Sequence, residues 1–159
     1  MHRRWRVFSL AVILTLAGDQ LAKVWARGHL VPGRAVRFLG GFWDWELSFN
    51  TGSAFGLFSS ASGARIFLSA VGIVACIGIM IWLRRTTDKN AWFAVALGLV
   101  FGGALGNVID RVIYGEVTDF VLWHAGTHRW PAFNVADAAL VAGVIILFLD
   151  LGRAKKKAA

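Results

Sequence analysis

Two long runs without a charged residue constrain this chain more than any other feature. Residues 66–83 and 91–109 form uninterrupted stretches of 18 and 19 uncharged, mostly apolar residues. A helix rises about 1.5 Å per residue, so about 20 residues cross the ~30 Å hydrocarbon core of a bilayer. Both runs therefore predict transmembrane helices.

Two further apolar segments are long enough to span the bilayer only if charged residues within them are included. Residues 7–26 contain Asp19 and Lys23, and residues 130–149 contain Asp137. The basic start followed by an apolar stretch resembles a signal peptide, but the apolar pattern continues past any cleavage point, which favours a retained first span. With 57% hydrophobic and only 16% charged residues, the chain has too few polar side chains to cover a water-soluble globule. We predict four spans in a single membrane-embedded domain, residues 1–159.

Ten of the 17 Lys and Arg residues fall into three short clusters that set the orientation. They precede the first predicted span, separate the second from the third, and follow the fourth: Arg3, Arg4, Arg6, Arg84, Arg85, Lys89, Arg153, Lys155, Lys156 and Lys157. Cytoplasmic loops accumulate Lys and Arg, so both termini are predicted to be cytoplasmic and residues 27–65 and 110–129 to face outward. The net charge of +8 thus indicates orientation. A nucleic-acid partner is excluded because these clusters form no continuous basic face.

The first outer segment has the character of a small sheet. Turn residues at 32–33 and 40–41 bracket the short run 34–39, and residues 42–49 (FWDWELSF) alternate loosely between apolar and polar. The predicted fold class is therefore an all-α membrane protein of four transmembrane helices, with a small β-sheet element between the first and second spans.

Ionised side chains at membrane depth are costly, so each needs a partner or a task. Asp19 and Lys23 are spaced i, i+4 and can meet on one helical face. Asp110 and Arg111 end the third span, and each must find a partner on another element.

Asp119 and Asp137 remain without an obvious cation nearby in sequence. Topology places both near the outer interface. Two carboxylates close together in a low-dielectric site hold one proton between them. Such a pair can hydrolyse a peptide bond, one activating water and the other protonating the carbonyl oxygen, with no metal or other cofactor. The competing interpretation is that Asp119 ends a loop and Asp137 caps the fourth helix. Asn107 and Asn134 could orient the carboxylates.

Two other functions are compatible with parts of the sequence. His124 and His128 have the i, i+4 spacing of a zinc-peptidase pair, but no Glu lies between them, and interfacial loop histidines are the simpler interpretation. A small channel or carrier could line a polar path with the intramembrane charges. That path would need polar residues along the full depth, whereas here they all lie toward the outer side.

Four stretches together resemble lipoprotein signal peptidase, the bacterial aspartyl protease family also called signal peptidase II. They are GDQLAK (18–23), FNTGSAFGLF (49–58), GGALGNVIDRVIYGEVTDF (102–120) and PAFNVADAAL (131–140). The resemblance implies that Asp119 and Asp137 are catalytic, which of them is the base remaining open. The supporting polar residues that it implies are Asp19, Lys23, Asn50, Gly52, Asn107, Asp110, Arg111 and Asn134.

The same resemblance implies a substrate and a place. The substrate is a prolipoprotein whose Cys carries diacylglycerol, cleaved on the amino side of that Cys. We expect a monomer in the bacterial inner membrane, surrounded by lipid, with its active site near the periplasmic face.

Overall fold

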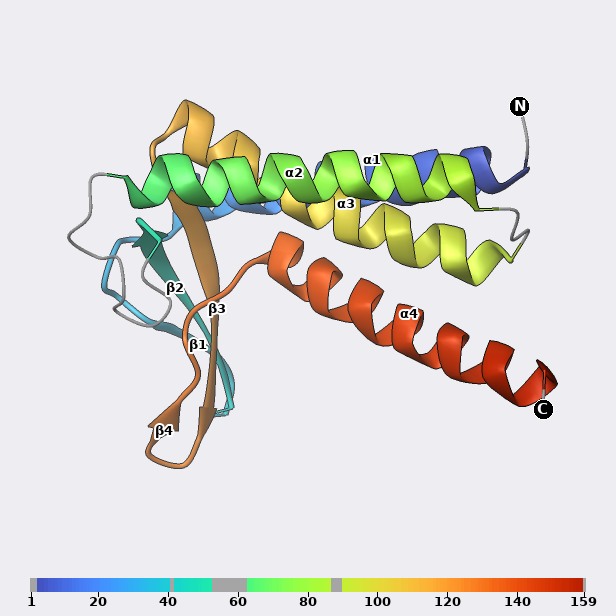
Figure 1. The fold of residues 1–159 in the computed structure, drawn as a ribbon. Coiled ribbons are helices and arrows are strands. Elements are labelled where there is room, and N and C mark those ends of the chain that lie inside the picture. The colour runs from blue at the N-terminus through green and yellow to red at the C-terminus, as the bar shows by residue number, and fades with distance from the viewer. Residues whose placement is uncertain (1–2, 41, 53–62, 87–89, 159) are drawn as a thin grey trace.

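A computed structural model describes residues 3–40, 42–52, 63–86 and 90–158, with side chains described through residue 150. Most of the FNTGSAFGLF stretch lies outside the described residues. The elements, in chain order, are α1 (Arg3–His29), β1 (Val36–Leu39), β2 (Trp43–Asn50), α2 (Ala64–Arg85), α3 (Ala91–Ile113), β3 (Val117–Ala125), β4 (His128–Arg129) and α4 (Val135–Ala158). The helices run side by side, and the sheet stands at the end of the bundle opposite the two termini (Figure 1).

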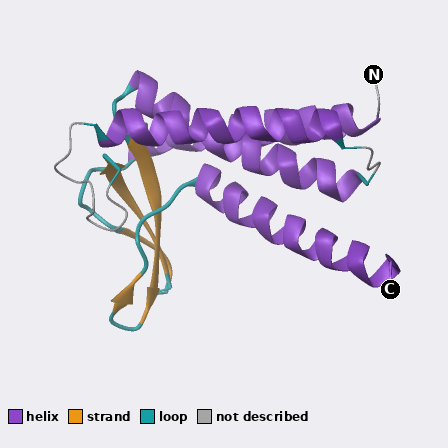
Figure 2. Ribbon diagram, in the orientation of Figure 1, coloured by secondary structure: helices purple, strands orange, loops and turns teal. Residues whose placement is uncertain are grey.

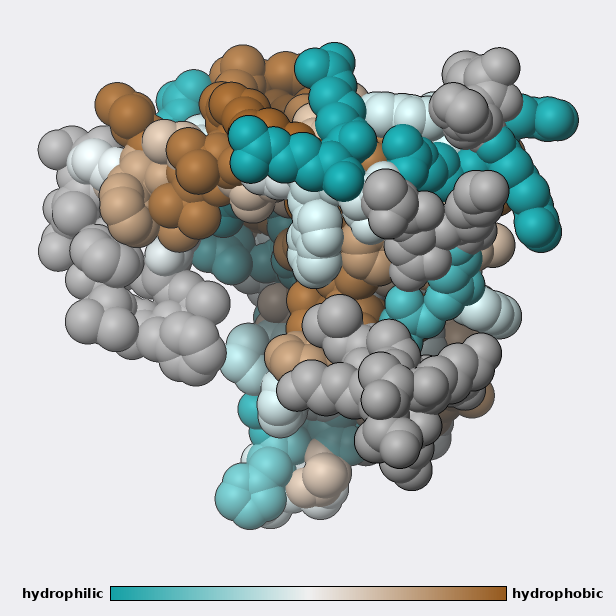
Figure 3. All heavy atoms as spheres, turned by 45° about the vertical axis from the view of Figure 1, so that its right-hand side comes forward, coloured by the Kyte–Doolittle hydropathy of each residue, from teal (hydrophilic) through white to brown (hydrophobic). Residues whose placement is uncertain are grey.

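Three of the four helices, α1, α2 and α3, are long and apolar enough to cross a membrane, counting only the residues that the structure describes. Each covers one of the predicted spans and extends it by a few residues. α3 is the most buried of the three and packs against each of the other helices. In Figure 3, hydrophobic side chains gather over the upper part of the visible face, while long hydrophilic ones project at the end turned toward the viewer.

Glycines let the helices approach closely. A Cβ at Gly98 would lie 2.8 Å from the carbonyl oxygen of Phe8, and one at Gly102 would lie 2.8 Å from Thr15 Cβ. Both glycines face α1, and Gly106 continues the row one turn further on. This row of glycines therefore allows close packing of α3 against α1.

The sheet is larger than the sequence predicted. It has four antiparallel strands in the order β1-β2-β3-β4, so the second outer segment supplies half of them, and Figure 2 shows all four at one end of the helices. Restricting the sheet to residues 27–65 was wrong. β3 was missed because six of its nine residues are buried in succession, which removes the polar–apolar alternation by which a half-exposed strand is recognised.

The fourth helix also begins later than predicted. Residues 130–134 are not helical, and α4 starts at Val135. The backbone of Phe133 exchanges hydrogen bonds with Val121 at 2.9 and 3.0 Å, and Trp130 donates to Trp123 at 2.8 Å. Because this segment pairs with β3 before the helix starts, the N-terminus of α4 is attached to the sheet.

Candidate active site

The two aspartates singled out by the sequence are brought to one place. Asp119 lies on β3, and Asp137 lies in the first turn of α4. Asn134 stands between them: its Nδ2 donates to Asp119 Oδ1 at 2.7 Å, and its backbone N–H donates to Asp137 Oδ2 at 3.3 Å. Asn107 on α3 holds the other side, donating from Nδ2 to Asp137 Oδ1 at 2.8 Å. Both asparagines thus bind carboxylates of the pair by hydrogen bonds.

Asp119 is the more enclosed of the pair, with only 2% of its surface exposed. Its second oxygen accepts a hydrogen bond from Asn50 Nδ2 at 3.1 Å. Burial, reinforced by the negative charge of Asp137, raises the pKa of Asp119 to about 7, while the bonds from Asn50 and Asn134 act in the opposite direction. A carboxyl with this pKa can hold a proton at neutral pH.

Asn50 also fixes the turn that follows β2. Its Oδ1 accepts from the backbone N–H of Gly52 at 2.9 Å. Gly52 has a φ of +119°, and a Cβ there would lie 2.7 Å from Leu68 Cδ1, so both backbone conformation and space favour glycine.

A buried cluster of three charged side chains, Asp19, Lys23 and Asp110, lies next to the two aspartates. Lys23 Nζ lies 2.8 Å from Asp19 Oδ2 and 3.4 Å from Asp110 Oδ2, and all three side chains are fully buried. Lys23 also donates to Asn107 Oδ1 at 3.0 Å. The predicted meeting of Asp19 and Lys23 is confirmed, and one cation links this cluster to the asparagine that holds Asp137.

Each carboxylate of this cluster also binds the backbone of an element that carries a dyad residue. Asp19 Oδ1 accepts from the N–H of Ala136, next to Asp137. Asp110 Oδ2 accepts from the N–H of Thr118, next to Asp119. The distances are 2.9 Å in both cases. The ion cluster therefore positions α4 and β3 together.

Sequence reasoning missed two members of this neighbourhood. Gln20 Nε2 donates to Asp19 Oδ2 at 3.0 Å and to the carbonyl of Gly106 at 3.3 Å. Arg27 donates to Thr118 Oγ1 at 2.7 Å and lies over the ring of Tyr114. Arg27 follows Lys23 by four residues, so the i, i+4 rule that paired Asp19 with Lys23 could have found it.

Arg111, another residue implied by the resemblance, bonds to the backbone of its own helix. It donates from Nη1 to the carbonyl of Asn107, in its own helix, at 3.4 Å. Its buried Nε makes no hydrogen bond within the described part of the chain. Its guanidinium therefore keeps donor capacity beside the dyad.

His124 and His128, the pair with zinc-peptidase spacing, have different surroundings. His124 Nε2 lies 2.9 Å from Asp44 Oδ2, an ion-pair distance without hydrogen-bond geometry, and His128 lies on the exposed strand β4. Across the described ranges, no group of three His, Cys, Asp or Glu residues is arranged to hold a metal ion.

Comparison with known proteins agrees with this geometry. A family model described as signal peptidase (SPase) II matches residues 11–153. A lipoprotein signal peptidase of Xylella fastidiosa (strain 9a5c) is 41% identical over 142 residues, covering 89% of this chain and 83% of the relative. The chain belongs to the signal peptidase II family. The channel or carrier interpretation is thereby set aside.

Further relatives extend the match over the whole signal peptidase fold. A lipoprotein signal peptidase of Ectopseudomonas mendocina (strain ymp) is 39% identical over 160 residues, covering 99% of this chain and 92% of the relative. A bacterial membrane enzyme solved by the in meso method at 2.3 Å resolution has a TM-score of 0.84 and 29% identity, and the match covers 94% of this chain and 90% of that one. This chain is accordingly an aspartic-type signal peptidase II, a bacterial membrane enzyme.

Proposed function

We propose that this signal peptidase II removes the signal peptide from diacylglyceryl-modified prolipoproteins, with Asp119 and Asp137 as its catalytic dyad. The observation that carries the proposal is the asparagine bridge: Asn134 binds both carboxylates through hydrogen bonds of 2.7 and 3.3 Å. The relatives named lipoprotein signal peptidase support the substrate class. The residues that support the dyad are Asp19, Lys23, Asn50, Gly52, Asn107, Asp110, Arg111 and Asn134.

The burial of Asp119 gives the two carboxylates different tasks. With a pKa of about 7, Asp119 holds the shared proton, and Asp137 acts as the base. Asp137 takes a proton from water as the water oxygen attacks the scissile carbonyl carbon, and Asp119 gives its proton to the carbonyl oxygen. On collapse of the tetrahedral intermediate, that proton returns to Asp119, the proton on Asp137 passes to the leaving amine, and the C–N bond breaks.

The proposed function also includes an arrangement of the helices and the sheet in the membrane. α4 serves as the fourth span, both termini lie in the cytoplasm, and the sheet and dyad lie at the periplasmic face of the inner membrane. The cation clusters at the cytoplasmic ends support this orientation. A substrate anchored in the bilayer by its acyl chains then meets the dyad at the membrane interface. All the proposed site residues come from one polypeptide, so the enzyme can act as a monomer.

The decisive experiment is cleavage of a diacylglyceryl-modified precursor by the purified enzyme. Asp119→Asn and Asp137→Asn are each expected to lower kcat by at least about a thousandfold, because removing a member of a catalytic constellation costs a factor of this order. Glu46→Gln, which removes a carboxylate from neighbouring β2, is the matched control and should retain turnover. Robust cleavage by either Asp variant contradicts the proposed dyad.

A further inference from the structure

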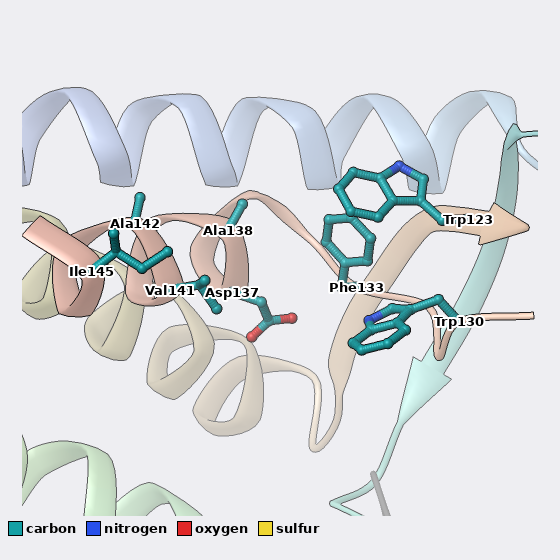
Figure 4. A pocket seen from close by; sticks show the side chains of 8 residues that line it. All are labelled: Trp123, Trp130, Phe133, Asp137, Ala138, Val141, Ala142 and Ile145. Carbon is teal, nitrogen blue, oxygen red and sulfur yellow. The ribbon is translucent and has the colours of Figure 1, made fainter. Parts of the chain in front are cut away.

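An open groove lies directly beside Asp137. It has a volume of about 390 Å³ and is lined by the aromatic rings of Trp123, Trp130 and Phe133 and, along α4, by Asp137, Ala138, Val141, Ala142 and Ile145. In Figure 4 the rings stand at one end, and the aliphatic side chains continue along the helix away from them. The groove therefore begins at the sheet and runs along the membrane-spanning helix.

The shape of the groove limits what it can hold. From Asp137 to Ile145 the helix advances roughly 12 Å at 1.5 Å per residue. This stretch of α4 bounds the aliphatic part of the groove, which is therefore long enough for an extended chain.

The lining decides between an extended peptide and a hydrocarbon chain. Among the described residues that line the groove, Asp137 alone is charged, and it lies between the aromatic rings and the aliphatic part along α4. An extended peptide would bring backbone N–H and C=O groups along an aliphatic wall, where unpaired polar groups are costly. A hydrocarbon chain has no such groups and gains from burial against Val141 and Ile145.

We infer that this groove binds one acyl chain of the substrate's own diacylglyceryl group. The inference rests on the proposed function, in which the lipidated Cys directly follows the scissile bond. A chain attached there begins within a residue of the dyad, and Asp137 belongs to both the dyad and the groove lining. This continuity favours the substrate's chain over that of a bilayer phospholipid, which has no connection to the scissile bond.

The test blocks the groove with a bulky side chain and compares precursors that carry long and short acyl chains. Ala142→Phe introduces a ring midway along the groove, while Val144→Phe places the same ring on an exposed position of α4 outside the lining. Each buried CH₂ contributes about a fourfold gain in affinity. Ala142→Phe is therefore expected to raise KM about tenfold for a dipalmitoyl precursor and to leave KM for a dibutyryl precursor within about twofold. Val144→Phe should change neither.

Binding to the inactive Asp119→Asn background separates this inference from the proposed function. There the dipalmitoyl precursor should bind more tightly than the dibutyryl one, and Ala142→Phe should remove that difference even though nothing is cleaved. Equal weakening of both precursors by Ala142→Phe, or no weakening of either, overturns the inference. The latter result is also what occupation by a bilayer lipid predicts. Cleavage by the Asp119→Asn enzyme, in contrast, counts against the dyad alone.

Discussion

The side chains of Asn134 and Asp137 each accept a hydrogen bond from the backbone N–H of the other residue. Asn134 Oδ1 accepts from the N–H of Asp137 at 3.0 Å, and Asp137 Oδ2 accepts from the N–H of Asn134 at 3.3 Å. This reciprocal pair is a capping box at the start of α4. Asp137 therefore caps its helix as the competing interpretation had it, and the same contacts fix the orientation of its carboxylate beside Asp119.

The two roles of Asn134 can be separated by substitution. Asn134→Ser keeps a good helix-capping acceptor but loses the buried donor to Asp119, so kcat should fall at least tenfold and stability by about 1–2 kcal/mol. Asn134→Ala loses both, and should cost about 1 kcal/mol of stability in addition. Activity assays and thermal unfolding of both variants check this. Full activity of Asn134→Ser would show that its amide is not needed at the dyad.

The raised pKa of Asp119 predicts the alkaline limb of the pH–rate profile. Its carboxyl loses the shared proton as pH rises through about 7, so kcat should fall above that pH, by about tenfold per pH unit. The bond from Asn50 lowers the pKa of Asp119. Asn50→Ala should therefore move the limb to higher pH, whereas Ser48→Ala, on the same strand, should leave it in place. A limb that moves downward in Asn50→Ala contradicts the assignment.

Lys23 balances two fully buried carboxylates. Lys23→Met leaves Asp19 and Asp110 without their cation and should destabilise the protein by about 3–5 kcal/mol, the usual cost of breaking a buried ion pair. Gln20→Met removes only neutral donors and should cost about 1–2 kcal/mol. Denaturation in detergent measures both losses. A Lys23→Met protein as stable as Gln20→Met would show that the cluster does not depend on its charge.

Gly106 leaves room for Asp19. A Cβ at position 106 would lie 2.6 Å from Asp19 Oδ2, so Gly106→Ala should displace the carboxylate that caps Ala136 and lower both stability and kcat. Gly78 on α2 has nothing within 4 Å of such a Cβ. Gly78→Ala should instead stabilise its helix by up to about 1 kcal/mol. If Gly106→Ala and Gly78→Ala change stability and kcat to the same extent, the close approach of Asp19 to Gly106 does not matter for activity.

The sequence was informative where the physics is local. Three of the four helices follow from runs of apolar residues, and Asp19 meets Lys23 because the helical repeat places them on one face. The lack of a nearby cation made a pair of Asp119 and Asp137 one of two open interpretations, and the resemblance implied their catalytic role. The resemblance then supplied the supporting residues, of which the structure joins Asn50, Asn107 and Asn134 to the dyad by hydrogen bonds.

The features that were missed depend on contacts distant in sequence. β3 has no alternation because it is covered on both sides, and the late start of α4 depends on pairing between Phe133 and Val121. The roles of Gln20 and Arg27 depend on acceptors 86 to 91 residues away. The helical repeat could have placed Arg27 on the same face as Lys23, but no local pattern encodes these distant acceptors, so only the folded chain reveals them.

The buried bond from Asp19 to Ala136 joins residues 117 positions apart, and β2 pairs Ser48 with Asp119. Asp119 therefore lies beside an early strand, and the residue before Asp137 is held by the first helix. The proposed dyad is thus completed only when α4, the last helix of the chain, docks against the first. We therefore expect cleavage to begin only after the whole chain has folded.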